Sequence, residues 1–198
     1  MLLCAAASFV DVLVLVESGL HEDMTGAVME IATRCGWSLV VLSSEVEREG
    51  RARLACFARG VGVQCLPSVN VILPGRLVVL ELAMVTSGAK ASVICCHGLP
   101  NISSPEEVDI ARTLARSLAA AARCVSVIAA IGDWNAVVVS RVASDRGSKS
   151  VQKNDGSVWS PVRALQSVGF IDVAAVYGLG GEEMATYHSG DRWSRVDA

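Results

Sequence analysis

Polar side chains that can do chemistry follow runs of apolar, β-forming residues at three places in the chain. Glu17 and His97 each follow one such run. Asp133 follows a third, two residues before Asn135, and a further carboxylate, Asp197, follows a short β-like stretch near the end of the sequence. Because a rigid sheet holds the residues at the ends of its strands, we expect Glu17, His97 and Asp133 to converge on one edge of the same sheet.

These residue types indicate chemistry on phosphate. Glu17 offers hard oxygen ligands of the kind that bind magnesium or manganese. Asp133 can bind the same ion or orient a water molecule, and Asn135 can donate a hydrogen bond to a phosphate oxygen. His97 can donate to a phosphate or protonate a leaving group.

Each of these residues also has a purely structural interpretation. A carboxylate such as Glu17 at the end of a strand is often only solvated, and residues such as Asp133 and Asn135 are common in turns. His97 follows two cysteines and can be a hydrogen-bonded side chain of the core. Asp197 is next to the last residue, where backbones fray.

The composition limits the class of protein. The chain has 198 residues, of which 52% are hydrophobic and 19% are charged, and its mean hydropathy is +0.47. This composition excludes a disordered chain, which lacks the apolar side chains to offset the entropy of ordering. The 17 basic and 20 acidic residues give a net charge of −3, so no strong basic field is available to hold nucleic acid or an anionic membrane. A nucleic-acid enzyme of this composition needs metal ions and a local basic patch.

Two apolar stretches are predicted to be buried elements and not membrane segments. Met1–Val16 lacks a basic beginning and is interrupted by Asp11, unlike a signal peptide. Leu118–Ile131 carries Arg123 and is too short to span a bilayer. The 7 cysteines show no CxxC or CxxxC spacing, so we expect no zinc ribbon, and reduced, mostly buried thiols in an intracellular protein.

The elements that must position the polar residues begin with a strand over Val10–Val16, which leads into Glu17. A helix follows over His21–Gly36, with Gly36 as its stop. Next comes a series of β-rich runs separated by turns that contain glycine or proline, including Pro67 and Pro74-Gly75. These runs are Ser38–Leu42, Ala52–Ala58, Val61–Leu66, Val69–Leu73, Arg76–Val85 and Ala91–Cys96.

The second half of the chain opens with its clearest local signal. Ser104-Pro105-Glu106-Glu107 predicts a capping box and a helix that continues to Arg123. Cys124–Ile131 then predicts a buried strand that leads into Asp133. The remaining expected elements are a helix near Pro161–Ser167 and strands at Ile171–Val176 and Thr186–His188. Hairpin-connected strands with a few helices predict helices packed on a sheet sandwich.

Four short motifs, in this order along the chain, resemble those of the endonuclease/exonuclease/phosphatase superfamily. Asp11–Ser18 is similar to the strand that ends in the superfamily's metal-binding glutamate. Cys96–Asn101 falls where members have a histidine or tyrosine ahead of a Pro-Asn turn. Ile131–Ala136 resembles the Gly-Asp-Phe-Asn motif, with Trp in place of Phe, and Ser194–Asp197 is similar to the late Ser-Arg-Ile-Asp motif.

The resemblance implies a DNase I-like, four-layer α/β sandwich in one domain over residues 1–198, and divalent-metal-dependent hydrolysis of phosphodiesters, with DNA as the substrate. It also implies that Glu17 binds magnesium or manganese. Asp133 activates the attacking water, and Asn135 holds the scissile phosphate. His97 contacts that phosphate or helps the leaving oxygen depart, and Asp197 orients a later histidine. The combination of motifs looks most like the endonuclease modules of retroelements.

The sequence departs from the superfamily pattern at both ends. Members carry a metal-binding asparagine upstream of the glutamate, and no candidate precedes Glu17. The sequence stops one residue after Asp197, before the segment with the members' final catalytic histidine, and His188 comes too early to replace it. We therefore expect an incomplete domain that lacks its first and last strands. Two other functions stay open: an inactive remnant of the fold, and a phosphatase of inositol phosphates or lipid head groups.

Overall fold

The structure is a computed structural model, and it describes residues 10–44, 52–59, 63–84, 86–99, 104–124, 126–134, 160–171, 187–189 and 192–194. The chain divides into two compact units. One consists of Met1–His97 with Cys124–Ile131, and the other of Gly98–Arg123 with Gly132–Ala198. That residues 1–198 form a single domain stays a prediction.

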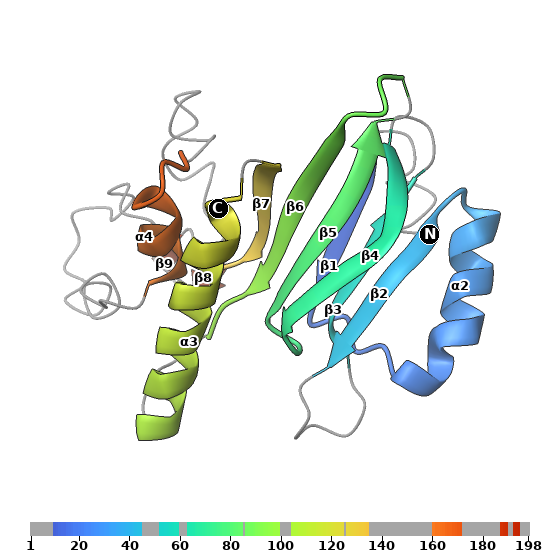
Figure 1. Cartoon of the computed structure of the whole chain (residues 1–198). Coiled ribbons are helices and arrows are strands. Elements are labelled where there is room, and N and C mark those ends of the chain that lie inside the picture. Colours follow the sequence, from blue (N-terminus) through green and yellow to red (C-terminus); the bar gives the residue numbers. More distant parts are fainter. Residues whose placement is uncertain are drawn as a thin grey trace. The chain divides into compact units, whose positions relative to one another are not determined.

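The first unit contains two β-sheets (Figure 1). One has three strands in the order β1-β3-β2, with antiparallel neighbours: β1 (Val12–Val16), β3 (Ala52–Ala58) and β2 (Ser38–Ser44). The other has four strands in the order β4-β5-β6-β7: β4 (Val63–Leu73), β5 (Leu77–Met84), β6 (Lys90–His97) and β7 (Val127–Asp133). The bounds of β1 and β3 confirm the strands predicted at Val10–Val16 and Ala52–Ala58.

The two sheets face each other across an apolar core. Strand alternation decides which residues enter it, because successive side chains of a strand point to opposite faces. In β3, Leu54 and Cys56 enter the core between the sheets, while Ala55 and Phe57 belong to a second cluster on the outer face. The core between the sheets is completed from β5 and β6 by Val78, Leu80, Leu82, Val93 and Cys95.

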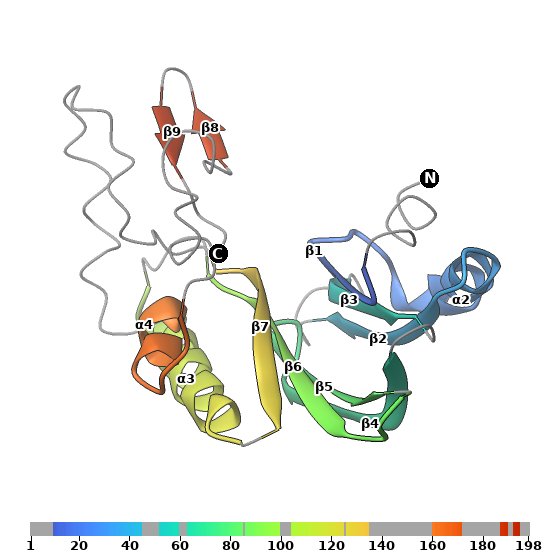
Figure 2. The same cartoon turned by 90° about the horizontal axis from the view of Figure 1, so that it is seen from above.

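Helix α2 (Thr25–Arg34) covers the outer face of the β1-β3-β2 sheet, after a short 3-10 turn, η1 (Glu22–Met24). Its Val28 and Ala32 pack with Trp37 and Phe57 in the second cluster. Figure 2 shows α2, the sheet β1-β3-β2 and the sheet β4-β5-β6-β7 as successive layers. The predicted helix over His21–Gly36 is confirmed, with narrower bounds.

Strand β4 is one strand where the sequence predicts two. A turn is expected at Pro67, between strands Val61–Leu66 and Val69–Leu73, but β4 continues through it. The pairing of β4 with β5 is irregular between Cys65 and Val69. Because β4 is an edge strand, the missing N–H of proline costs no ladder hydrogen bond at such an irregularity.

Strands β6 and β7 are parallel neighbours, joined by helix α3 (Pro105–Ala122). The backbone N–H of Ser92 donates to the carbonyl of Ser126, and that of Gly98 donates to the carbonyl of Asp133, both at 2.7 Å. Since the partner numbers rise together, the strands have the same direction, and a helical crossover is the usual connection between such strands.

Helix α3 begins with the predicted capping box. Ser104 Oγ accepts a hydrogen bond from the Glu107 N–H at 3.1 Å, and the Ser104 N–H donates to Glu107 Oε2 at 2.9 Å. Within the second unit, α3 packs with α4 (Pro161–Gln166). That unit also contains the hairpin of β8 (Tyr187–Ser189) and β9 (Arg192–Ser194). The strand predicted at Ile171–Val176 lies outside the described residues from position 172 onward.

Cysteine chemistry differs in part from the expectation. Cys56, Cys95 and Cys96 are buried free thiols, as predicted, and Cys124 is a free thiol at the surface. Cys35 is disulfide-bonded, so the expectation of reduced cysteines is wrong at this position. No helix among the described residues is both long enough and apolar enough to cross a membrane.

Candidate functional site

Arg76 and His97 form a cross-strand pair at one end of the β4-β5-β6-β7 sheet. A tight turn delivers Arg76 to this position: its N–H donates to the Leu73 carbonyl at 2.9 Å, after Pro74 and a left-handed Gly75 with a φ of 69°. These are the residue preferences of a type II turn. The backbone N–H of His97 then donates to the Arg76 carbonyl at 2.8 Å.

Both side chains of this pair are buried. His97 continues the inward row of Val93 and Cys95, and Arg76 precedes Val78 in the inward row of β5. His97 is 1% exposed and Arg76 is 9% exposed. Strand alternation therefore places an imidazole and a guanidinium group in the space between the sheets.

A side-chain hydrogen bond joins the two sheets beside Arg76. The N–H of Gly75 donates to Ser43 Oγ at 2.8 Å. Ser43 lies on β2 and is itself buried. A buried hydrogen bond of this kind is costly to break, because the donor left behind has no water to replace the partner. It fixes the turn that carries Arg76 against the opposite sheet.

Glu17 and Arg53 form the corresponding pair on the other sheet. Glu17 follows the end of β1, and its N–H donates to the Arg53 carbonyl at 2.8 Å. The side chains also meet, with Arg53 Nη1 lying 2.7 Å from Glu17 Oε1. Glu17 has a φ of 49°, the only positive value among the described residues that are not glycine. This left-handed conformation costs a residue with a side chain about 1–2 kcal/mol, and such outliers cluster at functional sites.

The two pairs meet at the same edge. Glu17 Oε1 lies 3.6 Å from His97 Nε2, which is close but too long for a hydrogen bond. The predicted convergence of Glu17 and His97 is confirmed. The prediction that both belong to one sheet is wrong, because Glu17 follows β1 and His97 ends β6, and the two sheets stack face to face.

His97 is neutral near pH 7. Burial lowers the pKa of its imidazole from 6.5 to about 4, and the positive charges of Arg76 and Arg53 act in the same direction. Arg76 Nη1 lies 3.4 Å from His97 Nδ1. Since a guanidinium group can only donate, Nδ1 must accept, and the ring hydrogen of the neutral form is on Nε2, the nitrogen that faces Glu17. In this state the ring can donate a hydrogen bond from Nε2, and the expected role of His97 in the departure of a leaving group stays a prediction.

Asp133 ends β7, and its backbone is fixed by the hydrogen bond from Gly98. Gly132 precedes it with a φ of 156°, and Trp134 after it is buried. The sequence motif around Asp133 therefore lies at the end of a strand, as predicted. Asp133 belongs to the second unit, whereas Glu17 and His97 belong to the first.

Glu17 is the residue of this edge that can hold a divalent cation. Its side chain is 58% exposed, and magnesium is commonly held by one or two carboxylates together with water and substrate phosphate. The donor type thus fits magnesium or manganese. Among the described residues, no three His, Cys, Asp or Glu side chains form a group that would hold a metal. Arg53 already occupies one oxygen of the carboxylate.

Comparison with solved structures shows which fold these elements form. AP endonuclease LMAP from Leishmania major aligns over 98% of this chain and 72% of its own, with a TM-score of 0.66 and 16% identity. D. rerio TDP2 in complex with a single-strand DNA product aligns over 99% and 72%, with a TM-score of 0.58 and 14% identity. The chain has the DNase I-like fold. The expected DNase I-like fold class is therefore confirmed.

Similarity to another solved structure covers a smaller part of the chain. ANGEL2, a 2',3'-cyclic phosphatase, aligns over 70% of this chain and 44% of its own, with a TM-score of 0.50 and 24% identity. The chain spans about half the length of several such structures, between 44% and 56% of three of them. No protein-family model and no curated protein matches the sequence.

The predicted site residues have three different outcomes within this DNase I-like fold. Glu17 and His97 lie together at the edge of the sandwich. Asp133 is the last residue of β7, and it belongs with Gly132 to the second unit, whereas β7 up to Ile131 belongs to the first. Asn135 and Asp197 lie outside the described residues. The catalytic and binding roles of all five stay predictions.

Arg53 and Arg76 are the residues of this edge that sequence reasoning missed. Both stand where strands begin: Arg53 is the second residue of β3, and Arg76 immediately precedes β5. A search limited to residues that follow strands overlooks them. In an antiparallel sheet, however, the start of one strand lies beside the end of its neighbour. A charged residue at the start of an apolar strand was the signal that could have identified both arginines.

Proposed function

We propose that this chain hydrolyses phosphodiesters of DNA, using a divalent cation bound at Glu17. The observation that carries the proposal is the approach of Glu17 Oε1 to His97 Nε2, 3.6 Å apart, between two arginines at one edge of the sandwich. The DNase I-like fold supports it, since the fold is shared with an AP endonuclease and with TDP2 in complex with a DNA product.

The two arginines supply the local positive charge that the composition lacks. The chain has a net charge of −3, yet Arg53 and Arg76 both lie close enough to His97 to lower its pKa. Guanidinium groups bind phosphate oxygens strongly, because their planar donors match the geometry of the anion. A DNA phosphate is thus attracted to this edge in spite of the overall charge.

His97 acts in this proposal as a hydrogen-bond donor and not as a proton donor. Its neutral ring carries hydrogen on Nε2, so it can donate to a non-bridging oxygen of the phosphate. Arg76 is the positioning residue, because its guanidinium group faces Nδ1 and keeps the ring in this tautomer. Because the pKa of His97 is about 4, its imidazole stays neutral from roughly pH 6 to pH 8, and its ability to donate a hydrogen bond does not change over this range.

The remaining roles follow the sequence motifs. Glu17 holds magnesium or manganese, which when bound neutralises charge on the reacting phosphate. Asp133 activates the attacking water, and Asn135 donates to the scissile phosphate. Asp197 has the orienting role that its motif implies. A retroelement-type endonuclease is the member class that we infer from the same motifs, acting within the cytoplasm or nucleus.

Two other functions use the same edge. A folded remnant without turnover is favoured by the ion pair between Arg53 and Glu17, since this pair occupies the proposed metal ligand. A phosphatase of inositol phosphates or lipid head groups is favoured by the two guanidinium groups, which suit a doubly charged phosphate monoester.

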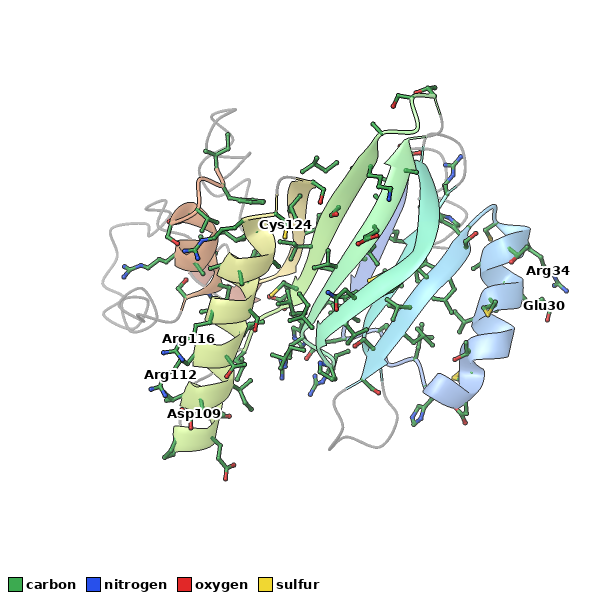
Figure 3. All side chains as sticks on the ribbon, in the orientation of Figure 1. Glu30, Arg34, Asp109, Arg112, Arg116 and Cys124 are labelled. Carbon is green, nitrogen blue, oxygen red and sulfur yellow. The ribbon has the colours of Figure 1, made fainter. Side chains whose placement is uncertain are left out.

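The test is nicking of supercoiled plasmid DNA in magnesium and in manganese. We expect Glu17→Gln to lower the nicking rate roughly 100-fold or more, because it removes the charge that binds the metal. Glu30→Gln is the matched control: it makes the same change on the exposed face of α2, in an ion pair with Arg34 (Figure 3), and should leave the rate unchanged. Equal loss in both variants contradicts the proposal. Folded wild type that cleaves only inositol phosphates supports the phosphatase, and no turnover on either substrate supports the remnant.

A further inference from the structure

Arg53 is the cation that holds Glu17 in this structure. The 2.7 Å between Arg53 Nη1 and Glu17 Oε1 is the length of a charge-assisted hydrogen bond. The Arg53 side chain is 16% exposed, whereas that of Glu17 is 58% exposed. The guanidinium group is therefore held largely by the protein, and the carboxylate is the partner that is open to solvent.

The strand register keeps Arg53 within reach of Glu17. Val16 lies opposite Leu54 in the antiparallel β1-β3 ladder. Glu17, which follows Val16, therefore lies opposite Arg53, which precedes Leu54. The hydrogen bond from the Glu17 N–H to the Arg53 carbonyl, 2.8 Å long, fixes the two backbones. Separation of the ion pair requires rotation of side chains alone. Because Arg53 is held beside Glu17 by the backbone, its effective concentration at the carboxylate is high, and a dissolved divalent ion must compete against it.

The positive charges at this edge oppose the binding of a divalent metal ion at Glu17. Glu17 carries one negative charge, whereas Arg53 and Arg76 each carry a positive charge. A divalent ion that approaches Glu17 must displace Arg53 from Oε1 and then remain close to a positive charge. Repulsion between a divalent ion and a unit charge a few ångströms away weakens binding roughly tenfold even in water.

We propose that Arg53 is a built-in competitor of the divalent cation at Glu17, and that it sets the metal affinity of the site. The ion binds when the guanidinium group leaves Glu17 Oε1. This inference rests on the proposed function only in taking Glu17 as the metal ligand. It adds a residue that keeps the site closed to metal at low ion concentration.

The experiment is a titration of the full chain with Mn²⁺ alone, in which free Mn²⁺ is measured by electron paramagnetic resonance. We expect Arg53→Gln to bind Mn²⁺ roughly tenfold more tightly than wild type, because it removes the charge and the contact with Oε1. Arg34→Gln is the matched control: it breaks another arginine–glutamate ion pair, that with Glu30 on α2 (Figure 3), and should bind Mn²⁺ as wild type does. Arg53→Ser is a second neutral variant, and circular dichroism shows whether each variant is folded.

The outcomes separate this inference from the proposed function. Equal Mn²⁺ affinity in wild type and in both folded Arg53 variants overturns the inference. Tighter binding that persists in the double variant Glu17→Gln/Arg53→Gln also overturns it, because the ion is then bound elsewhere. Tighter binding in Arg53→Gln that the double variant loses confirms it. Since no substrate is present, a failure of plasmid nicking leaves this result unchanged.

Discussion

At the scale of the residue, the chemistry of His97 depends on what surrounds it. Burial and the charges of Arg76 and Arg53 lower the pKa of its imidazole to about 4. A solvated histidine titrates near neutrality and is suited to proton transfer, whereas this one is a neutral donor with a fixed tautomer. The residue type alone is compatible with both roles, and the environment selects the second.

This lowered pKa predicts that stability depends on the state of His97. The folded-state pKa of about 4 lies below the ordinary value of 6.5, so between these pH values the unfolded chain binds a proton that the folded chain does not. The contribution of His97 to the free energy of unfolding is therefore complete above pH 6.5. As the pH falls from 6.5 through 4, the free energy of unfolding decreases by roughly 3 kcal/mol. We would measure urea unfolding at roughly pH 7, 5.5 and 4.5, which cover this range. The free energy of unfolding should depend less on pH in His97→Gln than in wild type. Parallel curves would contradict the prediction.

The backbone of Glu17 predicts an unusual order of stability. At most positions alanine is more stable than glycine, but at a φ of 49° the alanine side chain is strained and glycine is not. Both substitutions remove the same ion pair with Arg53, so that loss cancels in the comparison. We expect Glu17→Gly to be more stable than Glu17→Ala by about 1 kcal/mol in urea unfolding. An alanine variant at least as stable as the glycine variant would show that the left-handed conformation is not retained.

At the scale of the element, local sequence decides where helix α3 begins. Ser104 and Glu107 satisfy each other's backbone N–H groups, and Pro105 suits the first helical position. The apolar face also follows from the sequence, since Ala111, Leu114 and Leu118 are buried as their spacing predicts. These contacts lie within three or four residues of each other, which is why the sequence alone reveals them.

The cap of α3 gives a prediction at this scale. Ser104→Ala removes the side-chain oxygen that accepts the Glu107 N–H and should lower the free energy of unfolding by about 1 kcal/mol. Ser104→Asp keeps an acceptor and adds a negative charge at the helix N-terminus, so it should restore most of that loss. Chemical denaturation of the three proteins checks the order. Equal stability of the alanine and aspartate variants would mean that the cap contributes little.

At the scale of the whole molecule, the proposed site exists because two sheets pack together. Glu17 follows a strand of one sheet, and His97 ends a strand of the other. The core between them is built from residues such as Leu54 and Leu80, which are fully buried. Loss of that core separates the two halves of the edge even though each cross-strand pair stays intact within its sheet.

This dependence on the core predicts an effect of Leu80→Ala. Leu80 is 0% exposed, so the substitution removes buried methyl groups and should lower the free energy of unfolding by about 2–5 kcal/mol. Ile128→Ala is the control, since Ile128 is 66% exposed and its truncation should change stability by less than about 0.5 kcal/mol. Urea unfolding monitored by tryptophan fluorescence measures both. Similar effects of the two substitutions would contradict the packing described here.

The sequence by itself determined the local elements and the polar ends of their strands. Alternation and turn residues predict most strands, the capping box predicts α3, and the ordered motifs identify the DNase I-like fold, which the similarity to solved structures confirms. Each of these signals lies within a short stretch of chain. Pro67 shows the limit of such signals, because its effect depends on whether β4 is an edge strand.

Only the tertiary structure decided what surrounds Glu17. Sheet pairing brings Arg53 beside it, and the stacking of the two sheets brings His97 within 3.6 Å. Strand β3 pairs with β1 through contacts between residues about 40 positions apart, and no local pattern encodes which strands pair. The sequence therefore predicts a carboxylate suited to a metal, and the pairing of β1 with β3 adds the arginine that already contacts it.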